Sequence, residues 1–128
     1  MKILGVDFGL RKTGLAYAEG QLAEPFLVVK EHDELRLVEK IGRVVNEEGI
    51  EKIVIGVSEG KMAEKQRKFG AKMAEILGGV SVVYWDETLT SADANRMSIE
   101  AGVKRSRRKR MEDAFAAAVL LQSWLDNI

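Results

Sequence analysis

Three acidic residues stand at positions where a carboxylate needs a partner. Asp7 lies inside an apolar strand-like segment, Glu87 follows the carboxyl end of another, and Asp113 directly precedes a long apolar run. A buried carboxylate is costly unless it is paired, hydrogen-bonded or bound to a cation. If the three segments meet at one edge of a sheet, their oxygens suit a hard divalent cation, Mg²⁺ or Mn²⁺.

Phosphodiester hydrolysis is the chemistry that such a cluster favours. Two divalent ions about 4 Å apart can activate a water and stabilise the leaving oxygen of an in-line displacement. We therefore predict that Asp7, Glu87 and Asp113 are both the metal ligands and the catalytic residues of a hydrolase. Each acid also has a structural alternative: Asp7 could accept hydrogen bonds in the turn after its strand, Glu87 could simply end a strand, and Asp113 could cap a helix.

Other active-site chemistries are not supported by the sequence. The chain has no cysteine and a single histidine, His32. The lack of cysteine excludes disulfides and thiolate metal sites, and one histidine does not supply a structural zinc site or a serine triad. We expect His32 to lie at the surface, in the polar segment that leads into a helix.

A dense basic segment runs from Lys104 to Arg110. The chain carries 20 acidic and 20 basic residues, yet six positive charges gather in these seven positions. A neutral chain with one such segment presents a local surface for anions. The sequence therefore predicts nucleic acid as the partner, with a solvated loop as the alternative. The predicted contact residues are Lys104, Arg105, Arg107, Arg108, Lys109 and Arg110.

Length and composition limit the class of protein. The 128 residues have the size of one domain, and 46% hydrophobic with 31% charged residues are ordinary values for a globular chain. No apolar run approaches the roughly 20 residues of a membrane-spanning helix. The first residues pass quickly into a strand, so we expect no signal peptide. We predict a cytoplasmic protein without a membrane partner.

The strands that must position the first acid follow from hydrophobic alternation. Residues 2–8 alternate between two faces, and 14–18 read as a second strand. Two strands this close in sequence predict an antiparallel hairpin. A third strand is expected over 26–29, starting after Pro25.

The period then changes to that of a helix. Apolar residues at three- and four-residue spacing predict a helix over 33–48, with Asp33 as its N-cap and Gly49 at its end. The remaining expected elements are, in chain order, a strand over 53–57, a helix over 62–77, a strand over 80–85, and helices over 90–101 and 114–121.

This order of elements predicts an α/β fold. A hairpin-led group of three strands is followed by helix–strand crossovers, which place the later strands parallel. We predict a mixed five-stranded sheet, antiparallel across the first three strands and parallel thereafter, with helices on both faces. Ligands of such sheets bind beyond the carboxyl ends of the parallel strands, which is where Glu87 falls.

Several motifs, in order along the chain, resemble the YqgF/RuvX family. The first is Ile3-Leu4-Gly5-Val6-Asp7-Phe8-Gly9, followed by Lys12-Thr13-Gly14-Leu15-Ala16. The later motifs are Val54-Ile55-Gly56-Val57, then Asp86-Glu87-Thr88-Leu89-Thr90-Ser91 with Ala94, then Lys109 ahead of Asp113 with Ala116-Ala117. The opening motif alone is short, but the ordered set covers essentially the whole chain.

The resemblance implies both a fold and an activity. Members of this family are called pre-16S rRNA nucleases or Holliday junction resolvases, and they have an RNase H-like fold, so residues 1–128 would form a single RNase H-like nuclease domain. By position, Asp7 matches the family's first-strand acid, Glu87 its strand-end acid and Asp113 its C-terminal helix acid. Lys109 matches a basic residue ahead of that last acid, which could contact a phosphate.

Two positions depart from the family pattern. The family has Asp-Glu-Arg where this chain has Asp86-Glu87-Thr88, which removes a positive charge beside the acids. Arg96 or Arg11 could supply that charge. The family's Gly-Leu-Pro after the middle strand is Gly56-Val57-Ser58 in this chain, which changes the shape of the loop.

The predicted function is metal-dependent endonucleolytic cleavage of structured nucleic acid, with the 5′ end of precursor 16S rRNA as the favoured substrate. A Holliday junction resolvase is the alternative. Symmetric cleavage of a four-way DNA junction needs a homodimer, whereas rRNA trimming needs only a monomer. Two further alternatives are a catalytically weak RNA-binding or ribosome-associated module and half of an actin-like ATP-binding domain. The three acids favour a nuclease over the first, and the chain's length supplies only one of the two halves that the second requires.

Overall fold

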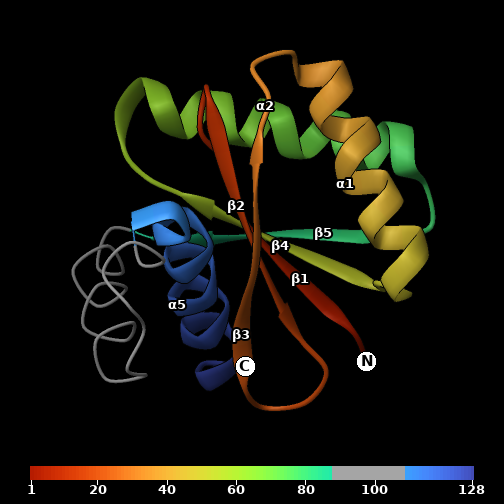
Figure 1. The fold of residues 1–128 in the computed structure, drawn as a ribbon, viewed down its shortest axis with the longest axis vertical. Helices are drawn as coiled ribbons and strands as arrows, with labels where there is room; N and C mark the ends of the chain where they lie inside the picture. The colour runs from red at the N-terminus through yellow and green to blue at the C-terminus, as the bar shows by residue number, and fades with distance from the viewer. Residues whose placement is uncertain (88–108) are drawn as a thin grey trace.

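The computed structural model describes residues 1–87 and 109–128 (Figure 1). Its strands are β1 Ile3–Asp7, β2 Lys12–Ala18, β3 Ala23–Lys30, β4 Lys52–Val57 and β5 Ser81–Asp86. They form one five-stranded sheet in the order β3-β2-β1-β4-β5. β2 is antiparallel to both β1 and β3, whereas β1, β4 and β5 are parallel to one another. The mixed sheet predicted from the sequence is confirmed.

Helices cover both faces of this sheet, as predicted (Figure 1). α1 (Glu34–Glu48) and α2 (Gly60–Leu77) pack on one face, and α5 (Glu112–Asp126) packs on the other. Alternate residues of β1 serve the two faces, because side chains along a strand point in opposite directions. Leu4 joins the core beneath α1 and α2, whereas Ile3 packs with α5.

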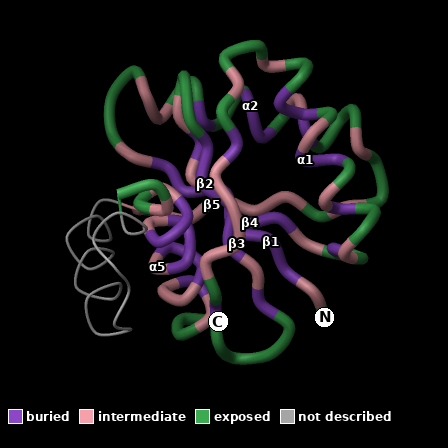
Figure 2. The backbone as a smooth tube through the Cα atoms, viewed as in Figure 1, coloured by how far each residue is buried: buried purple, intermediate pink, exposed green. Residues whose placement is uncertain are grey.

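Strands β1 and β4 and the side of α5 that faces the sheet are among the most buried parts of the fold (Figure 2). The buried residues of α5 continue from Ala114 to Trp124, so the helix is longer than the expected span of 114–121. Its burial confirms the prediction of a core helix near the end of the chain. Among the residues that the structure describes, no helix has the length and apolar character needed to cross a membrane.

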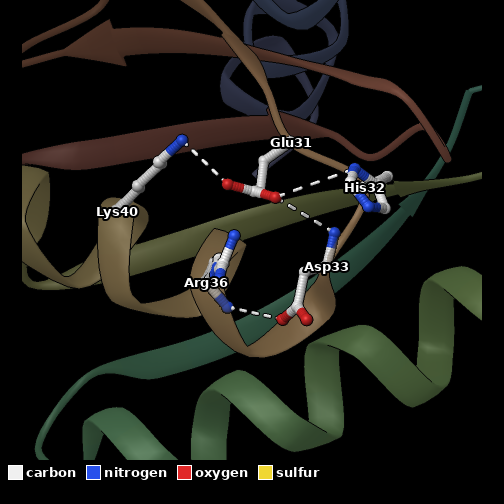
Figure 3. Close-up of polar contacts among 5 residues, drawn as sticks. All are labelled: Glu31, His32, Asp33, Arg36 and Lys40. Carbon is white, nitrogen blue, oxygen red and sulfur yellow. Dashed lines mark hydrogen bonds and ion pairs between the residues drawn. The ribbon is translucent and has the colours of Figure 1, made fainter.

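Asp33 and Gly49 mark the two ends of α1, as the sequence predicts. The Asp33 carboxylate accepts a hydrogen bond from the backbone N–H of Arg36 at 3.0 Å (Figure 3). At the other end, Gly49 adopts a left-handed conformation with φ 68°, which glycine tolerates without strain. These two residues fix where the helix starts and stops.

The segment that leads into α1 is held by Glu31. Its carboxylate accepts from the Lys40 ammonium at 2.9 Å and from the Asp33 backbone N–H at 3.2 Å (Figure 3). The hydrogen bond from Lys40 lowers the pKa of Glu31. His32 lies beside this carboxylate with its own side chain 86% exposed, which confirms that it is a surface residue. This cluster serves the helix entry and lies apart from the three acids.

One strand boundary was predicted wrongly. β3 begins at Ala23 and carries Pro25 within it, paired with Ala16, rather than starting after the proline. β3 is at the edge of the sheet, where the missing N–H of a proline leaves no ladder bond unmade, and the register shifts between Leu15 and Ala16 at this point. The helix expected over 90–101 lies outside the described residues.

Candidate active site

Asp7 ends β1 on the face that α5 covers. Two residues earlier, Gly5 points the same way and lies so close to the helix that a Cβ built there would be 2.9 Å from the Leu121 Cβ and 3.1 Å from the Ala117 carbonyl oxygen. One step of two residues along a strand is close to one turn along a helix. Asp7 therefore faces the turn of α5 that precedes Ala117, where Asp113 lies.

The neighbouring strand allows this close approach because it has a glycine at the matching position. Gly14 is the partner of Asp7 in the β1–β2 ladder. A Cβ at Gly14 would collide with the backbone carbonyl group of Asp113. The bare backbone of β2 thus lets the first turn of α5 rest on the sheet directly beside Asp7.

Glu87, which follows β5, places its side chain close to Asp7. Its backbone N–H donates to the Val57 carbonyl at 3.1 Å, which continues the β4–β5 pairing past Asp86. Its side chain lies over Gly56, where a Cβ would collide with the Glu87 Oε2. Gly56 follows Ile55, the partner of Val6 in the parallel ladder, so the Glu87 carboxylate lies over the strand next to Asp7.

Burial and the two neighbouring acids change the pKa of Asp7. Burial, the charge of Glu87, a hydrogen bond with the Glu87 side chain and the charge of Asp113 together raise the pKa of Asp7 to about 8. Burial also raises the pKa of Asp113, and the nearby Lys12 ammonium opposes that rise. The raised pKa favours the protonated form of the Asp7 carboxyl group at neutral pH.

The predicted ligand set is brought together only in part. Among residues 1–87 and 109–128, no three acidic, histidine or cysteine side chains are gathered around one point as ligands of a single ion. Asp7 and Glu87 are in contact, while Asp113 acts on them from the first turn of α5. Two carboxyl groups in contact suit a divalent cation, because the cation can replace the proton on Asp7 and compensate both charges. The donors are all oxygens, which fits Mg²⁺ or Mn²⁺.

Sequence reasoning missed Gln66, a buried side chain of α2 that holds Glu87. Its Nε2 donates to the Glu87 Oε1 at 2.9 Å, and its side chain is only 1% exposed. A signal was present in the sequence. Gln66 falls on the apolar stripe of α2 between Met62 and Phe69, where a polar residue needs a partner.

The predicted nucleic-acid contacts are only partly within the described residues. Lys109 and Arg110 are exposed and helical, and they lie just before α5. Lys12 approaches Asp113 closely enough to affect its pKa. The other predicted contacts, Lys104, Arg105, Arg107 and Arg108, lie outside the described residues, as do Thr88 and Arg96.

A polar hollow of about 190 Å³ lies at the carboxyl ends of β4 and β5, at the same sheet edge as Glu87. Arg67 lines it, with its guanidinium carbon 5.3 Å from the centre of the Tyr84 ring. This cation was not singled out from the sequence, because its position on α2 becomes meaningful only once α2 is placed beside β5. The hollow is also lined by Val57, Ser58, Trp85 and Asp86.

The family model described as "RuvX: Holliday junction resolvase" matches residues 1–127. The chain belongs to the RuvX family, a family of nucleases. It is 37% identical to a RuvX relative of Lactococcus lactis (strain IL1403), over 98% of this chain and 94% of that protein. It is 35% identical to a relative of Caldanaerobacter subterraneus subsp. tengcongensis, over 99% and 97% of the two chains. Both relatives carry the name "Putative pre-16S rRNA nuclease".

Solved structures show the same fold for this RuvX chain. T. thermophilus RuvC in complex with a Holliday junction substrate has a TM-score of 0.67 at 17% identity, over 99% of this chain and 96% of that one. Fowlpox virus resolvase with Holliday junction DNA has a TM-score of 0.66 at 12% identity, over 99% and 98%. At this identity the likeness establishes the fold, and it confirms the RNase H-like fold that the resemblance implied.

Proposed function

We propose that this RuvX chain is a divalent-metal-dependent endonuclease that trims the 5′ end of precursor 16S rRNA, with residues 1–128 acting as one nuclease domain. The observation that carries the proposal is the contact between the carboxyl groups of Asp7 and Glu87, with Asp113 brought beside them over Gly14. The choice of RNA follows the names of the bacterial relatives. Such an enzyme would act in the cytoplasm, where ribosomes are assembled.

The acids would hold the metal, each from a different element. Asp7 ends β1, Glu87 follows β5 and Asp113 lies in the first turn of α5, so the ligand set would be fixed by the packing of the sheet and helix. Bound Mg²⁺ or Mn²⁺ would supply Lewis acidity at the scissile phosphate, as in other two-metal nucleases. Asp113 would join the other two acids through a change in its side-chain torsion angles, because its backbone already lies beside Asp7.

Positive charge close to the acids would bind the flanking phosphates. Lys12 is near Asp113, and Lys109 and Arg110 stand at the entrance to α5. Arg67 adds a cation at the carboxyl edge of β4 and β5, and it could replace the positive charge of the arginine that the family has where this chain has Thr88. Fixed cations at this edge would offset the repulsion between an anionic substrate and the acids.

Holliday junction cleavage is the second candidate, because the family description and the solved structural neighbours concern resolvases. It requires two sites related by two-fold symmetry, hence a homodimer. The two candidates differ in an observable way: a monomer that trims RNA supports the first, and a dimer that cuts both strands of a junction supports the second.

One experiment tests the proposal directly. Purified protein is incubated with Mg²⁺ or Mn²⁺ and either a precursor 16S rRNA 5′ leader or a four-way DNA junction, and its mass in solution is measured in parallel. We expect cleavage of the RNA that is abolished by EDTA and by Asp7→Asn. Cleavage of neither substrate with either metal would contradict the nuclease proposal and favour a non-catalytic RNA-binding role.

A further inference from the structure

We propose that Gln66 is a positioning residue, which fixes the carboxylate of Glu87 through hydrogen bonds that start at the backbone of Ser58. Gln66 Oε1 accepts from the Ser58 backbone N–H at 2.7 Å and from the Ser58 hydroxyl at 3.1 Å. On its other side, Nε2 donates to the Glu87 Oε1 at 2.9 Å. The hydrogen bonds that fix Glu87 do not depend on the proposed function, whereas their effect on catalysis rests on it.

The direction of the chain of hydrogen bonds is set by the backbone. A backbone N–H can only donate, so the Gln66 atom that faces Ser58 must be the amide oxygen. The amide NH₂ therefore faces Glu87, and it can only donate. This removes the usual ambiguity between the two orientations of an amide and makes one oxygen of Glu87 an obligatory acceptor.

Glu87 is consequently held from two sides. Its Oε1 is fixed by Gln66, and its Oε2 lies against the bare backbone of Gly56 on the α5 face of the sheet. A carboxylate that ends a strand has freedom about three side-chain torsions unless something restrains it. Gln66 supplies that restraint, so the second oxygen remains on the side where Asp7 lies.

Burial makes the arrangement specific. Gln66 is 1% exposed, and the described residues contain no buried side-chain nitrogen or oxygen without a hydrogen-bond partner. A buried amide whose polar groups are all satisfied is rigid, because any other orientation leaves a donor or acceptor unpaired. An apolar side chain at this position of α2 would fill the space but would not make the hydrogen bonds to Ser58 and Glu87, so the glutamine is explained by the two groups that it joins.

This chain differs from the family pattern at Ser58, and the difference affects how the Gln66 amide is oriented. A proline at position 58 would have no N–H and could not orient the Gln66 amide. Ser58 supplies that donor, and its hydroxyl adds a second. Ser58 and Gln66 thus act as a pair: the first orients the amide, and the amide orients the acid.

The test compares Gln66→Met with Gln122→Met in the full chain. Gln122 is a matched control, because it also bridges two groups, accepting from the Ala23 N–H at 2.8 Å and donating to the Gln21 carbonyl at 2.9 Å, but it does so away from the acids. Mn²⁺ binding is measured by calorimetry, and cleavage kinetics are measured with Mg²⁺. We expect Gln66→Met to weaken Mn²⁺ binding about 10- to 100-fold and to lower kcat while leaving KM for the nucleic acid unchanged. Gln122→Met should alter neither.

Two further variants keep the proposal falsifiable. Gln66→Leu is a second apolar replacement of different shape that also removes the donor to Glu87, so it should weaken Mn²⁺ binding as Gln66→Met does. Ser58→Ala keeps the backbone N–H but loses the hydroxyl donor, so it should weaken Mn²⁺ binding less than Gln66→Met does. Crystal structures of the metal-free Gln66 variants should show Glu87 displaced from Gly56. Unchanged Glu87 placement with unchanged Mn²⁺ affinity in both Gln66 variants would overturn the proposal, even if the chain proves to have no nuclease activity.

Discussion

The carboxylate of Glu87 lies directly over the backbone of Gly56, in the space that a side chain at position 56 would occupy. The Leu120 side chain of α5 closes the same space from above, with its Cδ2 only 2.8 Å from where a Cβ would lie. Glycine is therefore required here for room, not for an unusual backbone conformation. The acid and the glycine form one structural unit.

Gly56→Ala should displace Glu87 and impair the proposed site. The added methyl group cannot be accommodated by a small shift, because Leu120 lies beside it, so the acid must move away from Asp7. We expect Mn²⁺ affinity and cleavage to fall by about tenfold or more, as for the loss of other groups that orient metal ligands. Gly20→Ala is the control, since a Cβ at Gly20 has nothing within 4 Å. Equal activity in the two variants would show that Glu87 does not need this position.

Asp7→Asn should stabilise the metal-free protein at alkaline pH. The pKa of Asp7 is about 8 in the folded chain, above its ordinary value of 3.8, so the folded state binds the extra proton between these two pH values. The stability of the unaltered chain should then fall as pH rises from about 4 to about 8, and the penalty should be complete above about 8. Thermal melts in EDTA at pH 5 and pH 9 test this: the variant should gain at pH 9 and differ little at pH 5. Glu39→Gln, which alters an exposed acid on α1, should show no such dependence on pH.

Metal binding should release a proton from the acid pair. A divalent ion needs the ionised carboxylates, and below a pH of about 8 Asp7 holds a proton that the ion must displace. Mn²⁺ affinity should therefore increase as pH rises towards about 8 and become constant above it. Calorimetry at pH 6.5 in buffers of different ionisation enthalpy should report close to one proton released per binding event. A count of zero at that pH would show that the ion binds elsewhere.

Replacing Lys109 and Arg110 with glutamine should weaken nucleic-acid binding without affecting stability. Each phosphate contact contributes about 0.7 to 0.9 to the slope of log affinity against log salt, so the loss of two contacts should flatten it by up to about 1.8. Exposed charges contribute little to folding, and the melting temperature should stay the same. The double change Arg36→Gln with Arg43→Gln, on α1 at the opposite face of the sheet, is the control. An unchanged slope in the Lys109 and Arg110 variant would indicate that this end of the basic segment is only solvated.

Much of the fold could be predicted from the sequence because its signals are local. The alternation in β1 placed Asp7 and Leu4 on opposite faces, and the cap at Asp33 and the stop at Gly49 mark the ends of α1. The boundary at Pro25 failed for a physical reason. A proline is incompatible with a central strand but acceptable at an edge, and whether β3 lies at the edge depends on the whole sheet.

The acids of the candidate site could be predicted from the sequence, but the residues that position them could not. Asp7 and Glu87 stand out as carboxylates at the ends of apolar segments, which is a feature of the chain itself. The roles of Gly56 and Gln66 depend on which side chain lies across from them in space. Asp113 was expected just before its helix, yet Met111 is the N-cap and Asp113 lies inside the first turn of α5.

The packing of α5 against Gly5 and Gly14 determines when Asp113 can come to lie beside Asp7 as the chain folds. The hairpin of β1 and β2 joins neighbours in the chain and can close early, whereas α5 follows every other described element and meets β1 across the longest separation in the fold. Until that last helix settles onto the two glycines, Asp7 has no Asp113 beside it. The three acids therefore come together only when the last described helix packs on the sheet, and the local hairpin of β1 and β2 is not sufficient to form the candidate site.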